Sequence, residues 1–271
     1  MNNLFSYLSD LLFKKENYKI FGPQGGLSTS CTLPEGFDTE KGRCPMVVLM
    51  HGFISSKRMP PIPYIAKALA EAGIASISFD FDAHGKSEGD FVDMTISSEI
   101  LDAKAIYEYA CSLPFVSDVA LLGHSQGGVV AGMLAGELES AERKPKCLVQ
   151  LAPAAVLKDD AIAGQCMGKR YDAKNPPEYV NVMFHKLGRK FILEAQQLPI
   201  YETSCKYSGN VCLIHGTNDK IVPVDYSRKY NELYPASELH ILENEGHFMT
   251  KSKAEICSII TSFLRKEFFG A

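Results

Sequence analysis

The stretch LLGHSQGG, Leu121–Gly128, decides the fold of this chain. An apolar run precedes it, and the small and apolar residues VVAGMLAG follow. Ser125 stands between Gly123 and Gly127 in the pattern GxSxG, where a serine occupies a sharp strand-to-helix turn. The pattern alone arises by chance in roughly one chain in ten of this length, but the flanking runs are those that the motif requires. We therefore predict a strand, a tight turn and a helix, with Ser125 as a nucleophile.

Composition places the chain among ordinary globular proteins. It has 271 residues, of which 46% are hydrophobic and 22% charged, so it can bury a sizeable core. The formal net charge is −4 and the two signs are interspersed. No basic region indicates nucleic acid or an anionic membrane as a partner, and no apolar run is long enough for a membrane span.

The cysteines and the N-terminus favour a cytoplasmic location. Eight cysteines are scattered without a CxxC pair, and Cys147 and Cys212 fall in apolar runs that predict buried strands. In a chain of this length such cysteines are typical of reduced core residues. The apolar segment Leu4 to Phe13 contains Asp10 and is followed by lysines, which is not the order of a secretory signal. We predict a short amphipathic helix there.

Apolar runs alternate with helical patterns along most of the chain, which is typical of parallel βαβ units. The runs are near-continuously apolar, as expected of a sheet covered on both faces. The predicted strands are 45–52, 75–82, 119–125, 147–153, 211–216 and 238–243, after an antiparallel hairpin around Pro23 to Gly26. The predicted helices are 62–72, 97–112, 127–140, 225–234 and 253–268.

One long interval interrupts this alternation. From about Val156 to Ser204 no strand run is found, and the interval is rich in aromatic residues and prolines. A plain crossover needs far fewer residues, so we predict an insertion over the carboxyl ends of the strands that acts as a lid. With no repeat or linker in the sequence, residues 1–271 are predicted to form a single domain with a lid over about 156–204.

A serine nucleophile needs a base and a residue that orients the base. His247 lies in ENEGHFM, just after the last predicted strand, and Asp219 follows the strand VCLIHG. The order Ser125, Asp219, His247, each at the carboxyl end of a strand, is that of a hydrolase triad. We predict these three residues as the catalytic set.

Other acids and histidines fit less well. Asp225 begins a predicted helix and is interpreted as its N-cap. The remaining histidines are assigned to upstream loops, to the lid or to a structural role beside Asp219; these are His51, His84 and His124, then His185, then His215.

An oxyanion formed during acyl transfer requires N–H donors. The residue after the nucleophile, Gln126, supplies one through its backbone. The loop HGF after the first parallel strand supplies the other, and Phe53 is the candidate, also through its backbone.

These motifs resemble the α/β-hydrolase superfamily and, more narrowly, the bacterial feruloyl (cinnamoyl) esterases. The resemblance extends from about Pro45 onward, through HGF, GHSQGG, VCLIHGTND and EGHF. The stretches LAPAAVLKDD and AQQLPIYE, which flank the predicted lid, are the more particular ones. The resemblance implies an α/β-hydrolase fold with a mostly parallel central sheet, helices on both faces and an inserted lid.

The resemblance also implies substrate-binding residues in the lid. The acid that binds the phenolic hydroxyl of a hydroxycinnamoyl group in such relatives corresponds to Asp160. A lid tyrosine of some relatives aligns with Phe191, which removes a hydroxyl donor. A glutamine near Met167 is absent, although Gln165 lies close by.

The sequence therefore predicts a serine carboxylesterase that hydrolyses feruloyl, caffeoyl or coumaroyl esters. A small aromatic ester is the expected partner, without nucleic acid or membrane, and exposed aromatics leave room for a homodimer. No metal or organic cofactor is expected, since no His/Cys ligand spacing is found. One alternative is a general short-acyl carboxylesterase, lipase or thioesterase. Another is a ligand-binding protein on the hydrolase fold.

Overall fold

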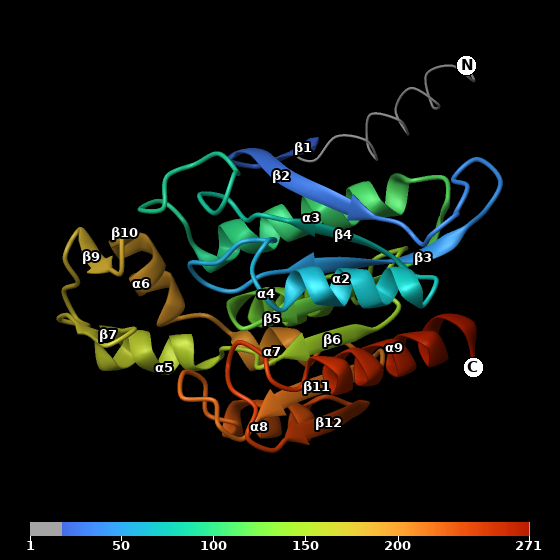
Figure 1. The fold of residues 1–271 in the computed structure, drawn as a ribbon. Helices are drawn as coiled ribbons and strands as arrows, with labels where there is room; N and C mark the ends of the chain where they lie inside the picture. The colour runs from blue at the N-terminus through green and yellow to red at the C-terminus, as the bar shows by residue number, and fades with distance from the viewer. Residues whose placement is uncertain (1–17, 271) are drawn as a thin grey trace.

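The computed structural model describes residues 18–270. The amphipathic helix predicted over Leu4 to Phe13 lies outside the described residues. A single sheet of eight strands runs through the molecule in the order β1-β2-β4-β3-β5-β6-β11-β12 (Figure 1). The strands are β1 Tyr18–Gly22, β2 Gly25–Thr32, β3 Cys44–Met50, β4 Ala75–Phe79, β5 Val116–His124, β6 Leu148–Leu151, β11 Val211–Gly216 and β12 Ser237–Leu242.

The sheet is mostly parallel, as predicted. β2 is antiparallel to both of its neighbours, β1 and β4, which gives the predicted lead-in hairpin. The other pairs, from β4 through β3, β5, β6 and β11 to β12, are all parallel. Every residue of β3, β4 and β11 is buried, because helices cover both faces of the sheet.

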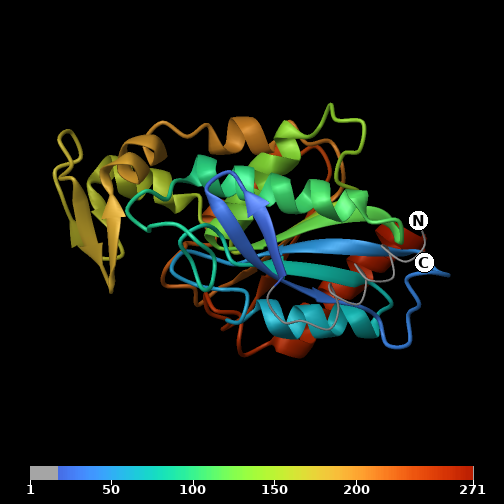
Figure 2. The same ribbon diagram turned by 90° about the horizontal axis from the view of Figure 1, so that it is seen from above.

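Helices lie on the two faces in separate groups (Figure 2). One face carries α2 and α9, and Ile62, Ile65 and Leu69 of α2 share one apolar stripe with a helical period. The other face carries α3, α4, α7 and α8. The helices are α2 Ile62–Glu71, α3 Ile96–Ser112, α4 Gln126–Glu137, α7 Ile200–Ser204, α8 Asp225–Leu233 and α9 Lys253–Phe269.

The segment 156–204 departs from the sequence expectation. It contains four short strands where none was predicted, because strands of two to four residues carry too little periodicity to detect. Figure 1 places the segment at the end of the sheet where β3 and β6 end. Besides α7, its elements are α5 Val156–Ala163, β7 Gln165–Cys166, β8 Lys169–Arg170, β9 Tyr179–Val182, β10 His185–Gly188 and α6 Arg189–Ala195. The single domain and the lid role stay predictions.

Within residues 18–270, no helix combines the length and apolar character that crossing a bilayer requires.

Candidate active site

Ser125 occupies a sharp turn between β5 and α4. Its backbone has φ 57° and ψ −123°, a conformation that L-residues with side chains rarely adopt. The flanking glycines permit the turn: a Cβ on Gly123 would lie 2.0 Å from the carbonyl oxygen of Gly127, and one on Gly127 would lie 2.3 Å from that of His51. The strain at Ser125 is therefore held by close backbone packing on both sides.

Two further strands bring the predicted partners to this turn. His247 follows β12, and its Nε2 lies 2.9 Å from the Ser125 Oγ. Asp219 follows β11, and its Oδ2 lies 2.7 Å from the His247 Nδ1. Ser125 and His247 are each only 7% exposed. The three residues predicted from chain order thus form one continuous hydrogen-bonded row.

The Asp219 carboxylate is held in its ionised form. Burial alone would raise its pKa, but hydrogen bonds from His215 and His247 lower that pKa well below its ordinary value. Its Oδ1 also accepts the backbone N–H groups of Ile221 and Val222, each at 2.8 Å. The carboxylate is therefore a fixed acceptor for the Nδ1 proton of His247.

His215 was assigned a structural role, and its contacts indicate that it positions Asp219. Its Nε2 lies 2.9 Å from the Val222 carbonyl oxygen and 3.3 Å from the Asp219 Oδ2. The hydroxyl of Ser227 lies 2.7 Å from its Nδ1. The ring is fully buried. Because both partners of Nε2 are acceptors, Nε2 carries the proton, and Nδ1 accepts from the Ser227 hydroxyl.

His124 also contacts the site, although the sequence assigned it to a loop. It is the last residue of β5 rather than a loop residue, and its Nε2 donates to the backbone carbonyl of His247 at 2.7 Å. Burial lowers its pKa to about 3, so the ring is neutral at pH 7. The contact spans 123 positions of sequence, and no local pattern predicts it.

Asp225, the rival acid, lies elsewhere. It is the first residue of α8, one position after the N-cap residue Val224, so its N-cap assignment was wrong by one residue. Its carboxylate pairs with the exposed Arg228 at 2.6 Å. This ion pair is on the surface and leaves Asp219 as the acid at His247.

The two predicted oxyanion donors flank Ser125. Gln126 is the first residue of α4, where a backbone N–H has no acceptor within the helix. Phe53 follows Gly52, and a Cβ on Gly52 would lie 2.9 Å from the Ser125 Cβ and 3.3 Å from its Oγ. The absence of a side chain at Gly52 thus lets the loop before Phe53 approach the nucleophile.

His51 orients the loop that carries Gly52 and Phe53. Its Nε2 accepts the backbone N–H of Phe81 at 3.1 Å, so the ring proton is on Nδ1 and is donated to the Gly52 carbonyl at 2.8 Å. Burial and the neighbouring His84 lower the pKa of His51 to about 3. The ring in this tautomer fixes the Gly52 carbonyl, which belongs to the same peptide unit as the Phe53 N–H.

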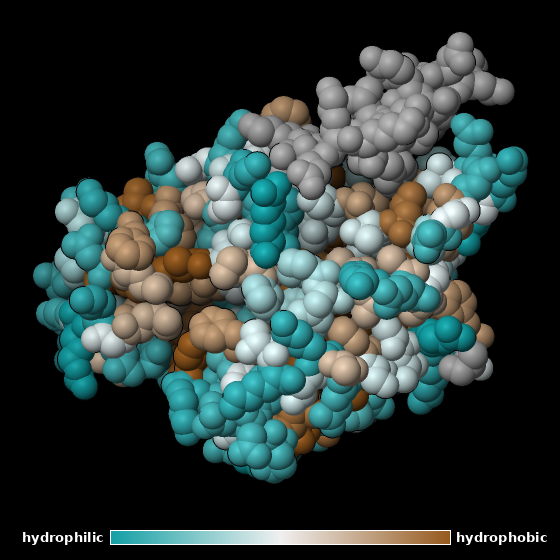
Figure 3. Space-filling view, in the orientation of Figure 1, coloured by the Kyte–Doolittle hydropathy of each residue, from teal (hydrophilic) through white to brown (hydrophobic). Residues whose placement is uncertain are grey.

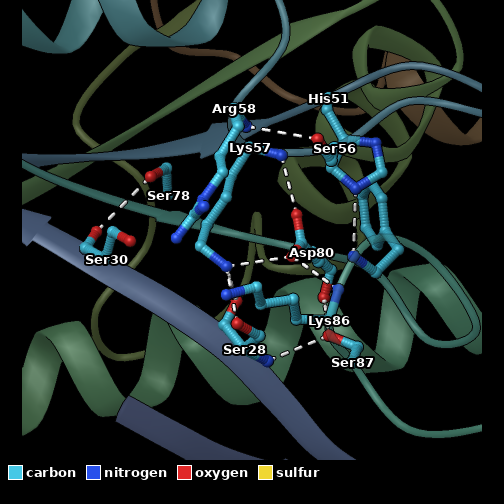
Figure 4. Close-up of polar contacts among 11 residues, drawn as sticks. Ser28, Ser30, His51, Ser56, Lys57, Arg58, Ser78, Asp80, Lys86 and Ser87 are labelled. Atoms are coloured by element: carbon cyan, nitrogen blue, oxygen red, sulfur yellow. Dashed lines mark hydrogen bonds and ion pairs between the residues drawn. The ribbon is translucent and has the colours of Figure 1, made fainter. Parts of the chain in front are cut away.

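A buried ion pair anchors the same loop further along (Figure 4). The Lys57 Nζ donates to the Asp80 carboxylate at 2.9 Å and to the Ser28 Oγ at 2.6 Å. The Asp80 carboxylate also accepts the backbone N–H groups of Lys57 and Lys86. The contacts join the loop after β3 to the loop after β4 and to β2.

A groove of about 990 Å³ lies beside this ion pair, between β2 and α2. Its lining includes Ser30, Ser78 and Arg58, and no triad residue borders it. The groove is therefore separate from the chemistry at Ser125.

The buried carboxyl groups of Asp82, Glu99 and Asp102 lie behind the start of α4. Glu99 and Asp102 project from α3, and the Glu99 Oε2 accepts from the Gln126 side chain at 2.8 Å. Asp102 accepts the backbone N–H of Asp82 at 2.9 Å, while its other oxygen has no partner among the described residues. Burial, with a smaller contribution from the charge of Asp82, raises the pKa of Asp102 to about 7.

The raised pKa of Asp102 predicts a pH-dependent stability. Between about pH 4 and pH 7 the unfolded chain releases this proton and the folded chain keeps it, so the contribution of Asp102 to the stability of the wild type falls as pH rises. We expect Asp102→Asn to unfold at a higher temperature than wild type at pH 8, and to lose that advantage at pH 4. Thermal unfolding at the two pH values measures this. The exposed Asp118→Asn is the control, and an equal gain for both variants would contradict the assignment.

The predicted substrate-binding residues occupy two places. Phe191 is buried in α6, and its ring stacks on Phe53 with centroids 6.0 Å apart. Phe53 also contacts Phe91, at 5.7 Å. Asp160, on α5, accepts a hydrogen bond from the Gln165 side chain at 2.8 Å. Within residues 18–270 no hydrogen bond joins this pair to the triad, so the structure places Phe191 against Phe53 and gives Asp160 and Gln165 no direct hydrogen bond to the triad.

Among the described residues, one group has the types and spacing of side chains that could hold a metal ion. Cys212, Glu238 and His240 bring one ligand atom each within 4.8 Å of one another, on β11 and β12. Burial, and next the nearby Glu238, raise the pKa of the Cys212 thiol, whereas a metal ligand must be a thiolate. The group is not in contact with the triad and adds no step to its chemistry.

Comparison with protein families gives two matches. The family described as "Serine hydrolase (FSH1)" matches residues 108–259, which is more than half of the chain. The family described as "Serine aminopeptidase, S33" matches residues 43–171. Between them, these ranges contain Ser125, Asp219 and His247.

Solved structures share the fold. The structure described as "Ferulic Acid bound to Est1E from Butyrivibrio proteoclasticus" has a TM-score of 0.87 and 26% identity, covering 92% of this chain and 98% of that chain. Alpha/beta hydrolase domain-containing protein 10 from mouse has a TM-score of 0.68 at 18% identity, covering 91% and 96%. The likeness to the mouse protein shows the α/β-hydrolase fold alone.

Curated relatives are more distant. "Palmitoyl-protein thioesterase ABHD10, mitochondrial" of Mus musculus is 23% identical over 230 residues, which cover 81% of this chain and 74% of the relative. "Protein ABHD12B" of Homo sapiens is 25% identical over 189 residues, which cover 70% of this chain. The matched part spans 49% of the length of the human protein.

Proposed function

The chain belongs to the serine hydrolase (FSH1) family, and from this premise we propose that it hydrolyses hydroxycinnamate esters, such as feruloyl, caffeoyl or coumaroyl esters, through an acyl-enzyme. The observation that carries the chemistry is the hydrogen-bonded row from Ser125 through His247 to Asp219. The expected partner is a small aromatic ester, and the eight unpaired cysteines fit a reaction in the reducing cytoplasm.

In the first step the Ser125 Oγ attacks the ester carbonyl carbon while the His247 Nε2 takes the hydroxyl proton. The Asp219 carboxylate keeps the His247 proton on Nδ1 and stabilises the imidazolium that forms. The imidazolium then protonates the departing alkoxide, and an acyl group remains on Ser125. Water attacks this ester with the same histidine as base, and the acid is released.

The carbonyl oxygen becomes negatively charged in both tetrahedral intermediates. The backbone N–H groups of Phe53 and Gln126 donate to it in this proposal. The Lys57–Asp80 ion pair and the His51 hydrogen bonds hold the loop that carries Phe53. Because these contacts exist before substrate binds, the donors need no reorganisation during the reaction.

Two observations support an aromatic acyl group. Phe53, Phe91 and Phe191 form a set of aromatic contacts beside the oxyanion loop. The structure with ferulic acid bound is that of a protein with the same fold over nearly the whole chain. A planar hydroxycinnamoyl ring would gain apolar and ring contacts from such a set.

Asp160 is proposed to accept the phenolic hydroxyl of the substrate. We expect Asp160→Ala to lower kcat/KM for methyl ferulate by about tenfold, the effect of losing one hydrogen bond to a charged group. Methyl cinnamate, which has no phenolic hydroxyl, should be cleaved equally well by variant and wild type. Steady-state kinetics with the two esters measure this, with Asp159→Ala as the neighbouring control. An equal loss on both esters would remove Asp160 from substrate recognition.

A second candidate is an acyl thioesterase or a general short-acyl esterase. It is favoured by the similarity to the palmitoyl-protein thioesterase of mouse. The test is a comparison of kcat/KM for methyl ferulate, p-nitrophenyl butyrate and palmitoyl coenzyme A with one enzyme preparation. Preference for methyl ferulate supports the hydroxycinnamate proposal, and preference for palmitoyl coenzyme A replaces it with the thioesterase.

A ligand-binding protein on the same fold is the alternative from another class. A complete triad argues against it, because binding alone does not require a polarised serine. Tight retention of ferulate with no turnover of any of the three substrates would favour this alternative.

A further inference from the structure

Two hairpin turns of the 156–204 segment carry methionine where methionine is unfavourable. The β7–β8 hairpin turns at Met167 and Gly168, and the β9–β10 hairpin turns at Met183 and Phe184. Met167 has φ 46° and Met183 has φ 52°. Glycine, asparagine or aspartate normally occupy such positions because positive φ strains other side chains.

The same turn residues are exposed rather than packed. The exposed fraction is 98% for Phe184, 63% for Met183 and 48% for Met167. Both hairpins lie at one end of the molecule in Figures 1 and 2. Methionine is unfavourable at positive φ, and burial within this chain does not account for the apolar side chains at these turns. We interpret them as residues that contact an apolar surface outside this chain.

The stretch that carries these turns is rich in basic residues, of which Lys190 pairs with Asp93 at 3.1 Å. Residues 165–190 contain six basic and two acidic residues, a formal charge of +4, whereas the whole chain carries −4. Lys169 and Arg170 follow the first turn directly and are exposed. Lys186 follows the second turn, with its Nζ 4.5 Å from the centre of the Tyr179 ring. Figure 3 shows hydrophobic residues beside hydrophilic ones at this end of the molecule.

We propose that the two hairpin turns dock the protein on an anionic lipid bilayer. Met167, Met183 and Phe184 enter the interfacial region, while Lys169, Arg170 and Lys186 contact anionic headgroups. The chain-wide charge, from which no membrane partner was expected, conceals this local excess. The sequence alone gave no sign that the two hairpins lie at one end of the molecule.

A bilayer fits these turns better than a protein partner does. A stable protein interface buries about 800 Å² on each side over a continuous surface. Two narrow turns offer apolar tips rather than such a surface, whereas a lipid interface closes around individual inserted side chains. The flanking cations match the charge of acidic headgroups, whereas two copies that met through these same hairpins would bring like charges together.

A chain of aromatic contacts connects the β9–β10 turn to the candidate active site. The ring of His185, next to Phe184, lies 4.4 Å from that of Phe91, which contacts Phe53 of the oxyanion loop. The bilayer surface would thus lie beside the segment that flanks the site. The inference goes beyond the proposed esterase activity and does not depend on which acyl group is cleaved.

The test is cosedimentation of the full chain with vesicles, using Ser125→Ala so that no turnover is needed. We expect binding to vesicles with about one third phosphatidylserine and weak binding to phosphatidylcholine alone. Replacing both Met183 and Phe184 with serine should weaken binding by about tenfold or more. Replacing both Lys169 and Arg170 with glutamate should weaken it similarly. Phe269→Ser, which removes an exposed aromatic side chain from α9, is the matched control.

Each result decides the proposal. Binding that is absent, equal on both vesicle types, or unchanged in the Met183/Phe184 double variant would overturn it. Dimers that dissociate in this double variant, without vesicle binding by the parent, would assign the turns to self-association instead. Equal unfolding temperatures of parent and variants check that the hairpins still fold.

Discussion

Replacing Ser125 by alanine should lower kcat by about 10⁵-fold or more, because the group that forms the acyl-enzyme is lost. The alanine side chain is smaller and the backbone is held by Gly123 and Gly127, so the fold should remain. The measurement is hydrolysis of p-nitrophenyl butyrate and methyl ferulate by wild type and variant. Both activities should fall together, since one nucleophile serves every acyl group.

The control for this variant is Ser112→Ala, a serine at the exposed end of α3. Its activity should match that of wild type within about twofold, as is usual for a surface change. Retention of ferulate hydrolysis by Ser125→Ala, with loss of butyrate hydrolysis, would mean that a second nucleophile acts on aromatic esters. Equal retention of both would remove the triad from the reaction altogether.

The central sheet could be predicted because its strands and helices carry long, regular signals. β3, β5 and β11 are runs of apolar residues followed by turn residues, and parallel strands end at one edge. Ser125 and Asp219 follow such runs, and His247 follows β12, the partly exposed strand that pairs with β11. Their meeting is therefore a consequence of topology, which the sequence pattern contains.

The segment 156–204 could not be predicted in the same way. β7 and β8 have two residues each, which is less than one period of any detectable pattern. The position of Asp160 beside Gln165 depends on where these short hairpins pack. The chain-wide net charge is a similar case, because it contains no information about which stretch carries an excess of one sign.

Buried histidines mark a second limit. His124 and His215 hold the backbone of His247 and the side chain of Asp219, respectively. His124 and His247 are 123 positions apart in the sequence, whereas His215 and Asp219 are four positions apart. No single spacing rule would therefore identify both contacts. What each histidine does depends on which atom of its ring meets which acceptor, and only the folded chain supplies that.

Asp219→Asn should lower kcat by about 10⁴-fold with little change in KM. The asparagine amide can donate to the His247 Nδ1, which then holds no proton, and the proton moves to Nε2. A protonated Nε2 cannot accept the proton of the Ser125 hydroxyl at 2.9 Å. The loss thus comes from the wrong tautomer, and it should appear in kcat because substrate binding does not require this proton.

Asp225→Asn separates this effect from a loss of charge. It also removes one carboxylate from the loop region after β11, but that carboxylate pairs with Arg228 on the surface. Its activity should stay within about twofold of wild type. If the two variants lost activity equally, the cause would be the loss of negative charge from the region after β11 and not the position of the His247 proton. If Asp225→Asn alone lost activity, the acid of the triad would be Asp225, against the 2.7 Å contact between Asp219 and His247.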